Sequence, residues 1–189
     1  LFDYLVSYID NRLSLPPVNF PEFDVSGNND IEQAALYCRN YWKLTPDQPI
    51  SNMIRVVENA GAVVTMFEGV SGAIDAFSID RARPIIIRST IKQSPTRLRF
   101  DIAHECGHLV MHKGIQTGNE KTEKQADRFA SAFLLPKEEF LKQFPNGRRL
   151  DWISIFRMKR HWNVSAQAII RRAHDLGLID HAQYKTANV

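Results

Sequence analysis

Residues 97–112 read RLRFDIAHECGHLVMH, and residues 123–136 read EKQADRFASAFLLP. The first stretch contains H-E-x-x-H, in which His104 and His108 are four residues apart. On a helix the two imidazoles lie on one face and can hold one Zn²⁺. Glu105 is rotated by about 100° from His104, which lets it reach water at the metal but not bind the metal beside both histidines. The pattern therefore predicts a zinc-binding helix with Glu105 as general base.

A third metal ligand is expected from the second stretch. Glu123 and Asp127 are four residues apart, so a helix places both carboxylates on one face. We expect Glu123 to complete the ligand set. Asp127 would accept a hydrogen bond from the ligating His104, or failing that from His108. Glu120, one turn earlier, is the alternative ligand, and a solvated helix carboxylate is the competing interpretation of Glu123.

Two further residues near this pattern receive structural interpretations. His112 continues the line of the two histidines, but its Cα would lie about 12 Å from that of His104. We therefore expect a hydrogen-bonded structural His rather than a fourth ligand. Cys106 is expected to be a small buried side chain, with a redox-sensitive thiol as the alternative. Cys106 and Cys38 are too few for a disulfide framework and favour a reducing cytoplasm.

The rest of the chain predicts an α+β fold in three parts. Residues 1–29 combine a helical pattern with a proline-rich stretch, which indicates an N-terminal helix and an extended arm. Residues 30–136 are expected to form the core, with helices from Asp30 as N-cap and over 51–59, and with the metal-binding helix from Ser94. A small mixed sheet in this core should contain three strands, at 62–67, 74–79 and 84–88. Residues 137–189 are expected to be a helical C-terminal region.

The strand at 84–88 has two interpretations. Pro84 cannot donate to a strand ladder, which favours an edge position. An exposed edge would offer main-chain hydrogen bonds to an extended peptide. The alternative is that Ile85, Ile86 and Ile87 form a strand buried on both faces.

Composition excludes some classes of protein and leaves others open. Of the 189 residues, 44% are hydrophobic and 24% are charged, which excludes wholesale disorder. The sequence shows no membrane span and no secretory signal. The net charge is +3, but residues 137–172 carry nine basic and three acidic groups. A basic segment of this kind could meet nucleic acid or an acidic partner, and solvated helix faces are the alternative.

The two quoted stretches resemble the ImmA/IrrE family of zinc metallo-endopeptidases. Similarity extends to residues 75–78, 83–87 and 162–172, and covers about residues 30–180. The resemblance implies a zincin-like metallopeptidase core. Its zinc ligands would be His104, His108 and Glu123, with Glu105 as the catalytic base. Cys106 departs from the apolar residue that is usual in the family.

The resemblance also implies a biological role. Family members cut a helix-turn-helix transcriptional repressor and thereby derepress stress, phage or mobile-element genes. Many carry an N-terminal helix-turn-helix domain, and this chain starts with Leu1 rather than Met, so we expect a preceding segment that links the protein to DNA. The alternatives are a non-proteolytic metal-containing sensor or binding module, and a transcriptional regulator that binds a repressor or DNA. The intact Glu105 favours hydrolysis, because binding alone needs no base.

Overall fold

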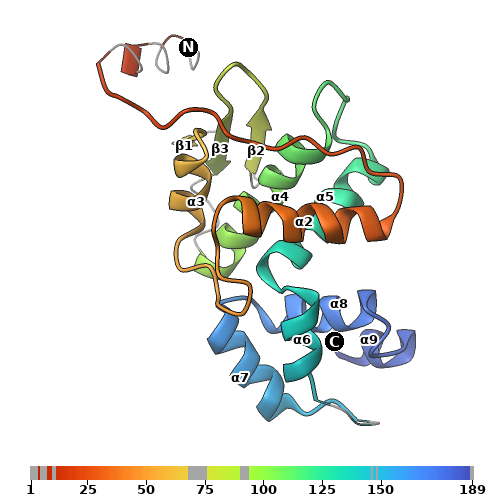
Figure 1. The fold of residues 1–189 in the computed structure, drawn as a ribbon. Helices are drawn as coiled ribbons and strands as arrows, with labels where there is room; N and C mark the ends of the chain where they lie inside the picture. The colour runs from red at the N-terminus through yellow and green to blue at the C-terminus, as the bar shows by residue number, and fades with distance from the viewer. Residues whose placement is uncertain are drawn as a thin grey trace.

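The computed structural model describes residues 4, 8–9, 12–67, 76–89, 94–145, 147 and 149–187. A small sheet lies at one end of the molecule, helices pack beneath it, and a second group of helices forms the other end (Figure 1). The predicted α+β class, with a small mixed sheet packed on helices, is confirmed. The helix expected over residues 1–13 lies mostly outside the described residues, and so do residues 74–75 of the second expected strand.

The described sheet has the strand order β1-β3-β2. Its strands are β1 (Val63–Phe67), β2 (Ala76–Ile79) and β3 (Ile85–Ser89). β3 pairs in parallel with β1 and antiparallel with β2, so the sheet is mixed. Of these strands, β2 is the outer one that lies against the helix with the H-E-x-x-H motif.

The predicted edge position of residues 84–88 is wrong. β3 is the central strand of the described sheet, and Ile85, Ile86 and Ile87 are buried. Pro84 precedes the strand, where its carbonyl accepts a hydrogen bond from the N–H of Val63 at 2.9 Å. Because Pro84 lies before β3, its lack of an N–H does not interrupt the strand pairing. The burial of three consecutive isoleucines indicates a central strand and outweighs the proline as evidence for an edge.

Helices of the core pack closely on one another. They are α2 (Asn28–Tyr41), α3 (Met53–Asn59), α4 (Pro95–Met111) and α5 (Glu120–Leu134). Asp30 is the third residue of α2 rather than its N-cap, and its carboxylate accepts hydrogen bonds from the N–H groups of Ser26 and Gly27. Gly107 lets α4 approach α5, because an added Cβ would lie 3.0 Å from Cδ1 of the buried Phe129. This close approach sets the distance between the two helices that carry the predicted metal ligands.

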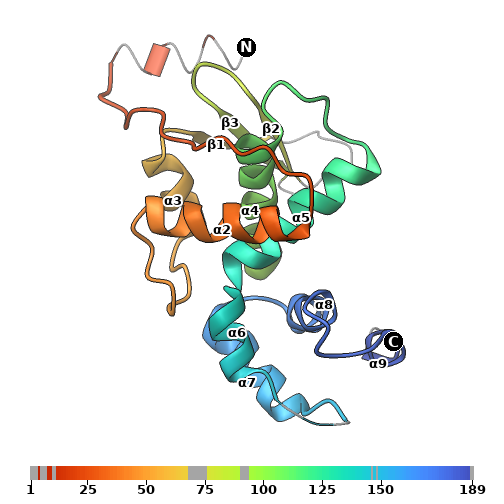
Figure 2. The ribbon, with the colours of Figure 1, turned by 45° about the vertical axis from the view of Figure 1, so that its right-hand side comes forward.

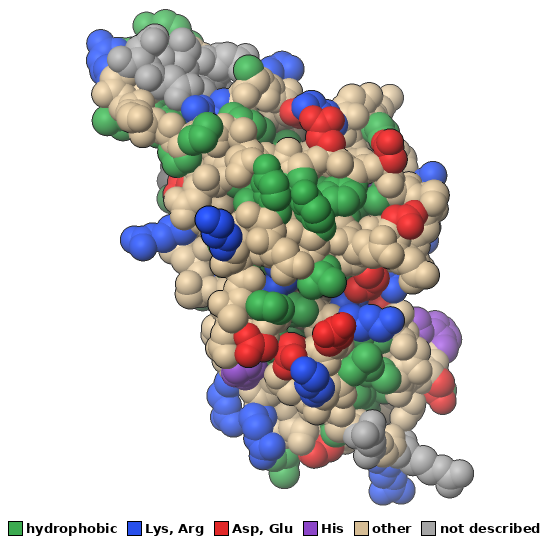
Figure 3. Space-filling model, in the orientation of Figure 1, with side chains coloured by type: hydrophobic (Ala, Val, Ile, Leu, Met, Phe, Trp, Pro, Cys, Tyr) green, Lys and Arg blue, Asp and Glu red, His purple; other side chains and the backbone are tan. Residues whose placement is uncertain are grey.

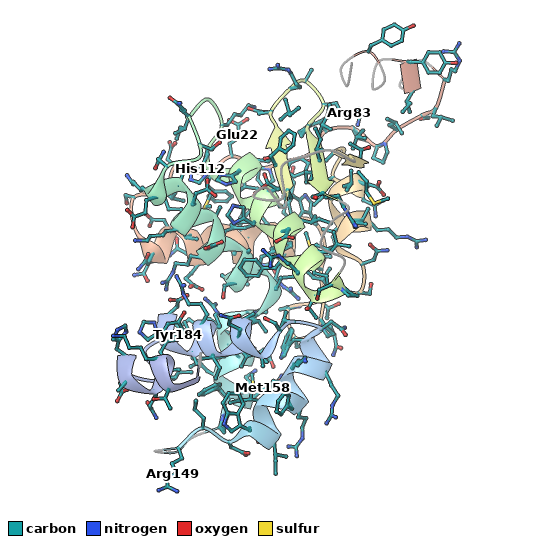
Figure 4. The ribbon with its side chains drawn as sticks, turned by 180° about the vertical axis from the view of Figure 1, so that it is seen from behind. Glu22, Arg83, His112, Arg149, Met158 and Tyr184 are labelled. Atoms are coloured by element: carbon teal, nitrogen blue, oxygen red, sulfur yellow. The ribbon has the colours of Figure 1, made fainter. Side chains whose placement is uncertain are left out.

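The C-terminal helices form a separate layer below the core (Figure 2). They are α6 (Lys137–Gln143), α7 (Trp152–Trp162), α8 (Ala166–Asp175) and α9 (His181–Ala187). Met158 of α7 is buried among these helices, whereas Arg149 points away from them (Figure 4). Lys and Arg side chains gather on the outer surface of this layer, over α7 (Figure 3). Basic side chains of α7 thus form an exposed face at the end of the molecule opposite to the sheet.

A buried ion pair anchors the C-terminal layer to the core. Arg172 of α8 is 0% exposed, and its Nη1 and Nη2 each donate to a carboxylate oxygen of Glu32 of α2 at 2.7 Å. Nε of Arg172 donates to the carbonyl of Leu135 at 3.1 Å. Arg128 of α5 lies 3.2 Å from the same Glu32 carboxylate. A single carboxylate therefore joins α2, α5 and α8.

The extended arm crosses the surface before α2. The N–H of Asn19 donates to the carbonyl of Ala60 at 2.8 Å, and that of Phe23 donates to the carbonyl of Val110 at 2.9 Å. These bonds hold the arm against the ends of α3 and α4. Among the helices that the structure describes, each is too short or too polar to cross a lipid bilayer.

Candidate metal centre

The structure brings the three predicted ligands together. His104 and His108 project from adjacent turns of α4, and their Nε2 atoms are 3.0 Å apart. Glu123, in the first turn of α5, places Oε2 at 3.1 Å from Nε2 of His104 and Oε1 at 3.4 Å from Nε2 of His108. The ligand atoms of these residues all lie within 4.8 Å of one another. Two imidazoles and one carboxylate thus converge on a point that can hold a metal ion.

Asp127 orients the first histidine. It lies one turn after Glu123 on α5, and its Oδ1 is 2.9 Å from Nδ1 of His104. Because the carboxylate accepts, Nδ1 of His104 carries a proton, and the neutral imidazole directs its Nε2 lone pair towards the cluster. The alternative ligand Glu120 is not brought to this point. It is 82% exposed and pairs with Lys124 at 2.5 Å.

His112 orients the second histidine. Its side chain is buried, its Nδ1 lies 2.9 Å from Nδ1 of His108, and its Nε2 lies 3.0 Å from Oε1 of Gln125 (Figure 4). The amide oxygen of Gln125 accepts the Nε2 proton, so Nδ1 of His112 can accept from Nδ1–H of His108. That arrangement leaves Nε2 of His108 free to bind a metal. The predicted hydrogen-bonded His112 is confirmed, whereas Gln125 was missed, because nothing in its sequence position distinguishes it.

Glu105 lies beside the cluster with a partner that sequence reasoning missed. It is 5% exposed, and its Oε2 accepts a hydrogen bond from Oγ of Ser78 at 2.6 Å. Burial raises the pKa of Glu105, while the hydrogen bond from Ser78 and the charge of His104 oppose that rise. Ser78 could not be found from the sequence, because it comes from a strand 27 residues away along the chain.

Electrostatics give the two histidines different proton affinities in the absence of a metal. Burial, followed by the neighbouring His104, lowers the pKa of His108 to about 4. Burial also acts to lower the pKa of His104, but Asp127 and the two glutamates Glu105 and Glu123 raise it overall. At neutral pH His108 therefore offers a free lone pair, whereas the raised pKa of His104 widens the pH range in which a proton competes with a cation there.

The cluster faces a large cleft. This cleft has a volume of about 1010 Å³ and lies between the core and the C-terminal layer. His104, Glu105 and Asp127 line its inner wall, and Ala76 of β2 lies at its margin. Gln167 of α8 lies on the opposite wall. Further lining residues of that wall are Val164, Ser165, Ala168, Arg171, Asp175 and Tyr184. A segment of another polypeptide can enter a space of this size and reach the buried carboxylate.

Comparisons with known proteins point to one family. The peptidase family model described as the IrrE N-terminal-like domain matches residues 57–174, which is more than half of the chain. The solved structure of a Mycobacterium tuberculosis transcriptional regulator is similar in fold, with a TM-score of 0.54 and 18% sequence identity. The match covers 77% of this chain but 47% of that regulator, so this chain spans about half of its length. Among curated proteins, no sequence matches.

Proposed function

Because the chain belongs to the IrrE N-terminal-like peptidase family, we propose that it is a zinc-dependent endopeptidase with His104, His108 and Glu123 as zinc ligands. The observation that carries this proposal is the buried carboxylate of Glu105 next to three converging ligands. A purely metal-binding site has no use for a second, unligated carboxylate at this position. A hydrolase needs one as its general base.

The ligand geometry suits zinc. Ligand atoms at about 2.0–2.1 Å from a tetrahedral zinc ion lie about 3.3–3.4 Å from one another. The Nε2 atoms of His104 and His108 are 3.0 Å apart, and they lie 3.1 Å from Oε2 and 3.4 Å from Oε1 of Glu123 respectively, so a modest rearrangement admits the ion. Two imidazoles with one carboxylate are the ligand set of several zinc peptidases, and they leave a fourth position open.

The residues around the site have distinct roles in peptide hydrolysis. When bound, zinc supplies a Lewis acid that polarises the scissile carbonyl and lowers the pKa of water. Glu105 accepts a proton from the attacking water and delivers it to the leaving nitrogen. Its raised pKa suits this exchange, because the carboxyl can both take up and release a proton closer to neutrality. Asp127 keeps the proton of His104 on Nδ1, away from the metal.

The outer strand β2 is the proposed docking edge for an extended substrate. In the described sheet β2 pairs with β3 on one side, so its other side can pair with a peptide. The hydroxyl of Ser78 on this strand donates to Glu105. Ala76 also lines the cleft. A peptide that pairs with β2 would therefore pass directly beside Glu105, with α8 on its other side.

The proposed substrate is a transcriptional repressor of the helix-turn-helix class in the cytoplasm. Support comes from the family resemblance, and the structurally similar Mycobacterium tuberculosis protein is itself described as a transcriptional regulator. We also propose that a preceding segment of a longer product links the protein to DNA. Direct reading of DNA by α8 is disfavoured, because Gln167 and Arg171 of that helix line the cleft.

Incubation with candidate substrates tests the proposed activity. The zinc-loaded protein is mixed with purified repressors encoded beside its gene, and fragments are identified by gel electrophoresis and mass spectrometry. We expect cleavage at a defined peptide bond, its loss in Glu105→Gln, and its retention in Glu138→Gln, which makes the same change on the exposed surface of α6. Equal cleavage by Glu105→Gln would contradict the assigned base. Tight repressor binding without cleavage in either protein would support the sensor alternative.

A further inference from the structure

Ser78 donates a hydrogen bond to the carboxylate of Glu105. Its Oγ lies 2.6 Å from Oε2 of that side chain. The two residues belong to different elements, since Ser78 lies in the middle of β2 and Glu105 lies in the middle of α4. Because both elements are regular and packed on each other, the contact is fixed at both ends.

One carboxylate oxygen is thereby held while the other stays available. A glutamate side chain has three rotatable bonds, and an unrestrained carboxylate would sample several orientations. The bond from the Ser78 hydroxyl engages Oε2. Building on the proposed peptidase function, we propose that Ser78 is a positioning residue, which holds Oε2 of Glu105 so that Oε1 faces the attacking water.

Ser78 contacts the proposed base, whereas other residues orient the proposed metal ligands. His104 is oriented by Asp127, and His108 is oriented by His112. The hydroxyl of Ser78 is directed instead to Glu105. Deleting the hydroxyl should therefore lower the rate of the chemical step without changing the affinity for zinc.

The position of Ser78 also relates the base to the substrate. Ser78 belongs to the same strand, β2, that is the proposed docking edge for the peptide. The strand that would fix the scissile bond thus also fixes the carboxylate that acts on it. An orientation error of the carboxylate would affect the reacting geometry but not the docking of the peptide.

Kinetic comparison of three variants tests this role. Ser78→Ala deletes the hydroxyl, Ser78→Thr retains a hydroxyl in a residue that strands favour, and Thr65→Val removes a hydroxyl from β1 as the matched control. The substrate is the best-cleaved member of a library of fluorescence-quenched peptides. For Ser78→Ala we expect a kcat about 10–100-fold lower, from the loss of a hydrogen bond to a charged group. KM and zinc content should stay unchanged, and Ser78→Thr should restore most of kcat.

A measurement that does not depend on activity tests the positioning role of Ser78 separately from the proposed peptidase function. In crystal structures of the metal-free proteins, Glu105 should occupy one rotamer in the wild type and several in Ser78→Ala. If the wild type cuts no peptide but the rotamers differ in this way, the peptidase proposal fails and the positioning role stands. An unchanged kcat, or a single unchanged Glu105 rotamer in Ser78→Ala, would overturn the positioning role. A rise in KM with unchanged kcat would do the same, because it would assign Ser78 to peptide docking.

Discussion

Replacing Glu32 by Ala should strongly destabilise the protein, because it leaves the buried Arg172 without a counter-charge. Arg172 is 0% exposed, and two of its nitrogens donate to Glu32 at 2.7 Å. Removing one partner of a buried ion pair costs about 3–5 kcal/mol, most of it from the charge left unpaired. For a chain of this size each kcal/mol lowers the melting temperature by about 2–4 °C, so we expect a decrease of about 6–20 °C.

The assay is thermal and urea unfolding followed by circular dichroism. Glu120→Ala is the matched control, because it also deletes a helix glutamate that pairs with a basic residue, here the exposed Lys124. Surface pairs of this kind contribute little, so the control should melt with the wild type. The double variant Glu32→Met with Arg172→Met should be more stable than Glu32→Ala, since it removes the more deeply buried of the two arginines that lose their partner.

The outcome also tests how the cleft is built. Glu32 and Arg172 join α2 to α8, and α8 forms the wall opposite to the metal ligands. Loss of the pair should loosen that wall, which limited proteolysis would detect as faster cleavage within residues 137–187. A Glu32→Ala protein that melts with the wild type and resists proteolysis equally would refute the reasoning.

Three further predictions concern the metal site. Asp127→Ala should weaken zinc affinity or activity by about 10–100-fold. A fully metallated, fully active variant would show that Asp127 is a solvated carboxylate with no role in orienting His104. Although burial opposes it, the pKa of His104 is raised by Asp127 and the nearby glutamates, so zinc binding should be coupled to proton release and should weaken as the pH falls. Calorimetry in two buffers of different ionisation enthalpy measures this release, and a zero proton count would contradict it. Gly107→Ala should lower the free energy of unfolding by about 0–2 kcal/mol, because the contact of the added Cβ with Phe129 outweighs the gain in helix propensity. A more stable variant with unchanged zinc affinity would contradict this packing argument.

Most of what the sequence could predict about the site depends on the spacing of residues along a helix. His104 and His108 needed only a helix to share a face, and the four-residue spacing of Glu123 and Asp127 needed only a second helix. The structure brings these residues together at 2.9–3.4 Å. Their roles as ligands and orienting group stay predictions until a metal is measured, and so does the division of the chain at residues 29–30 and 136–137.

The features that the sequence could not predict depend on contacts between segments that are far apart along the chain. Pro84 suggested an edge strand, yet strand order depends on which neighbours complete the ladder, and the run of isoleucines is covered on both faces. Ser78 acquires its role from the packing of β2 on α4, and Gln125 acquires its role from the position of His112. A hydrogen bond between segments distant in sequence leaves no periodic signal, so a single sequence does not reveal it.

The two walls of the cleft come from separate stretches of the chain. One wall carries His104 and the other reactive groups of α4 and α5, whereas the other wall is formed by residues 164–184. If the protein is the proposed peptidase, mutations in the second stretch would therefore change which peptides fit without disturbing the catalytic groups. Such a division would let a lineage of these proteins acquire new targets through changes in α8 and α9 while the reaction itself is preserved. It also gives protein engineers a defined segment to randomise when they seek a protease of altered selectivity.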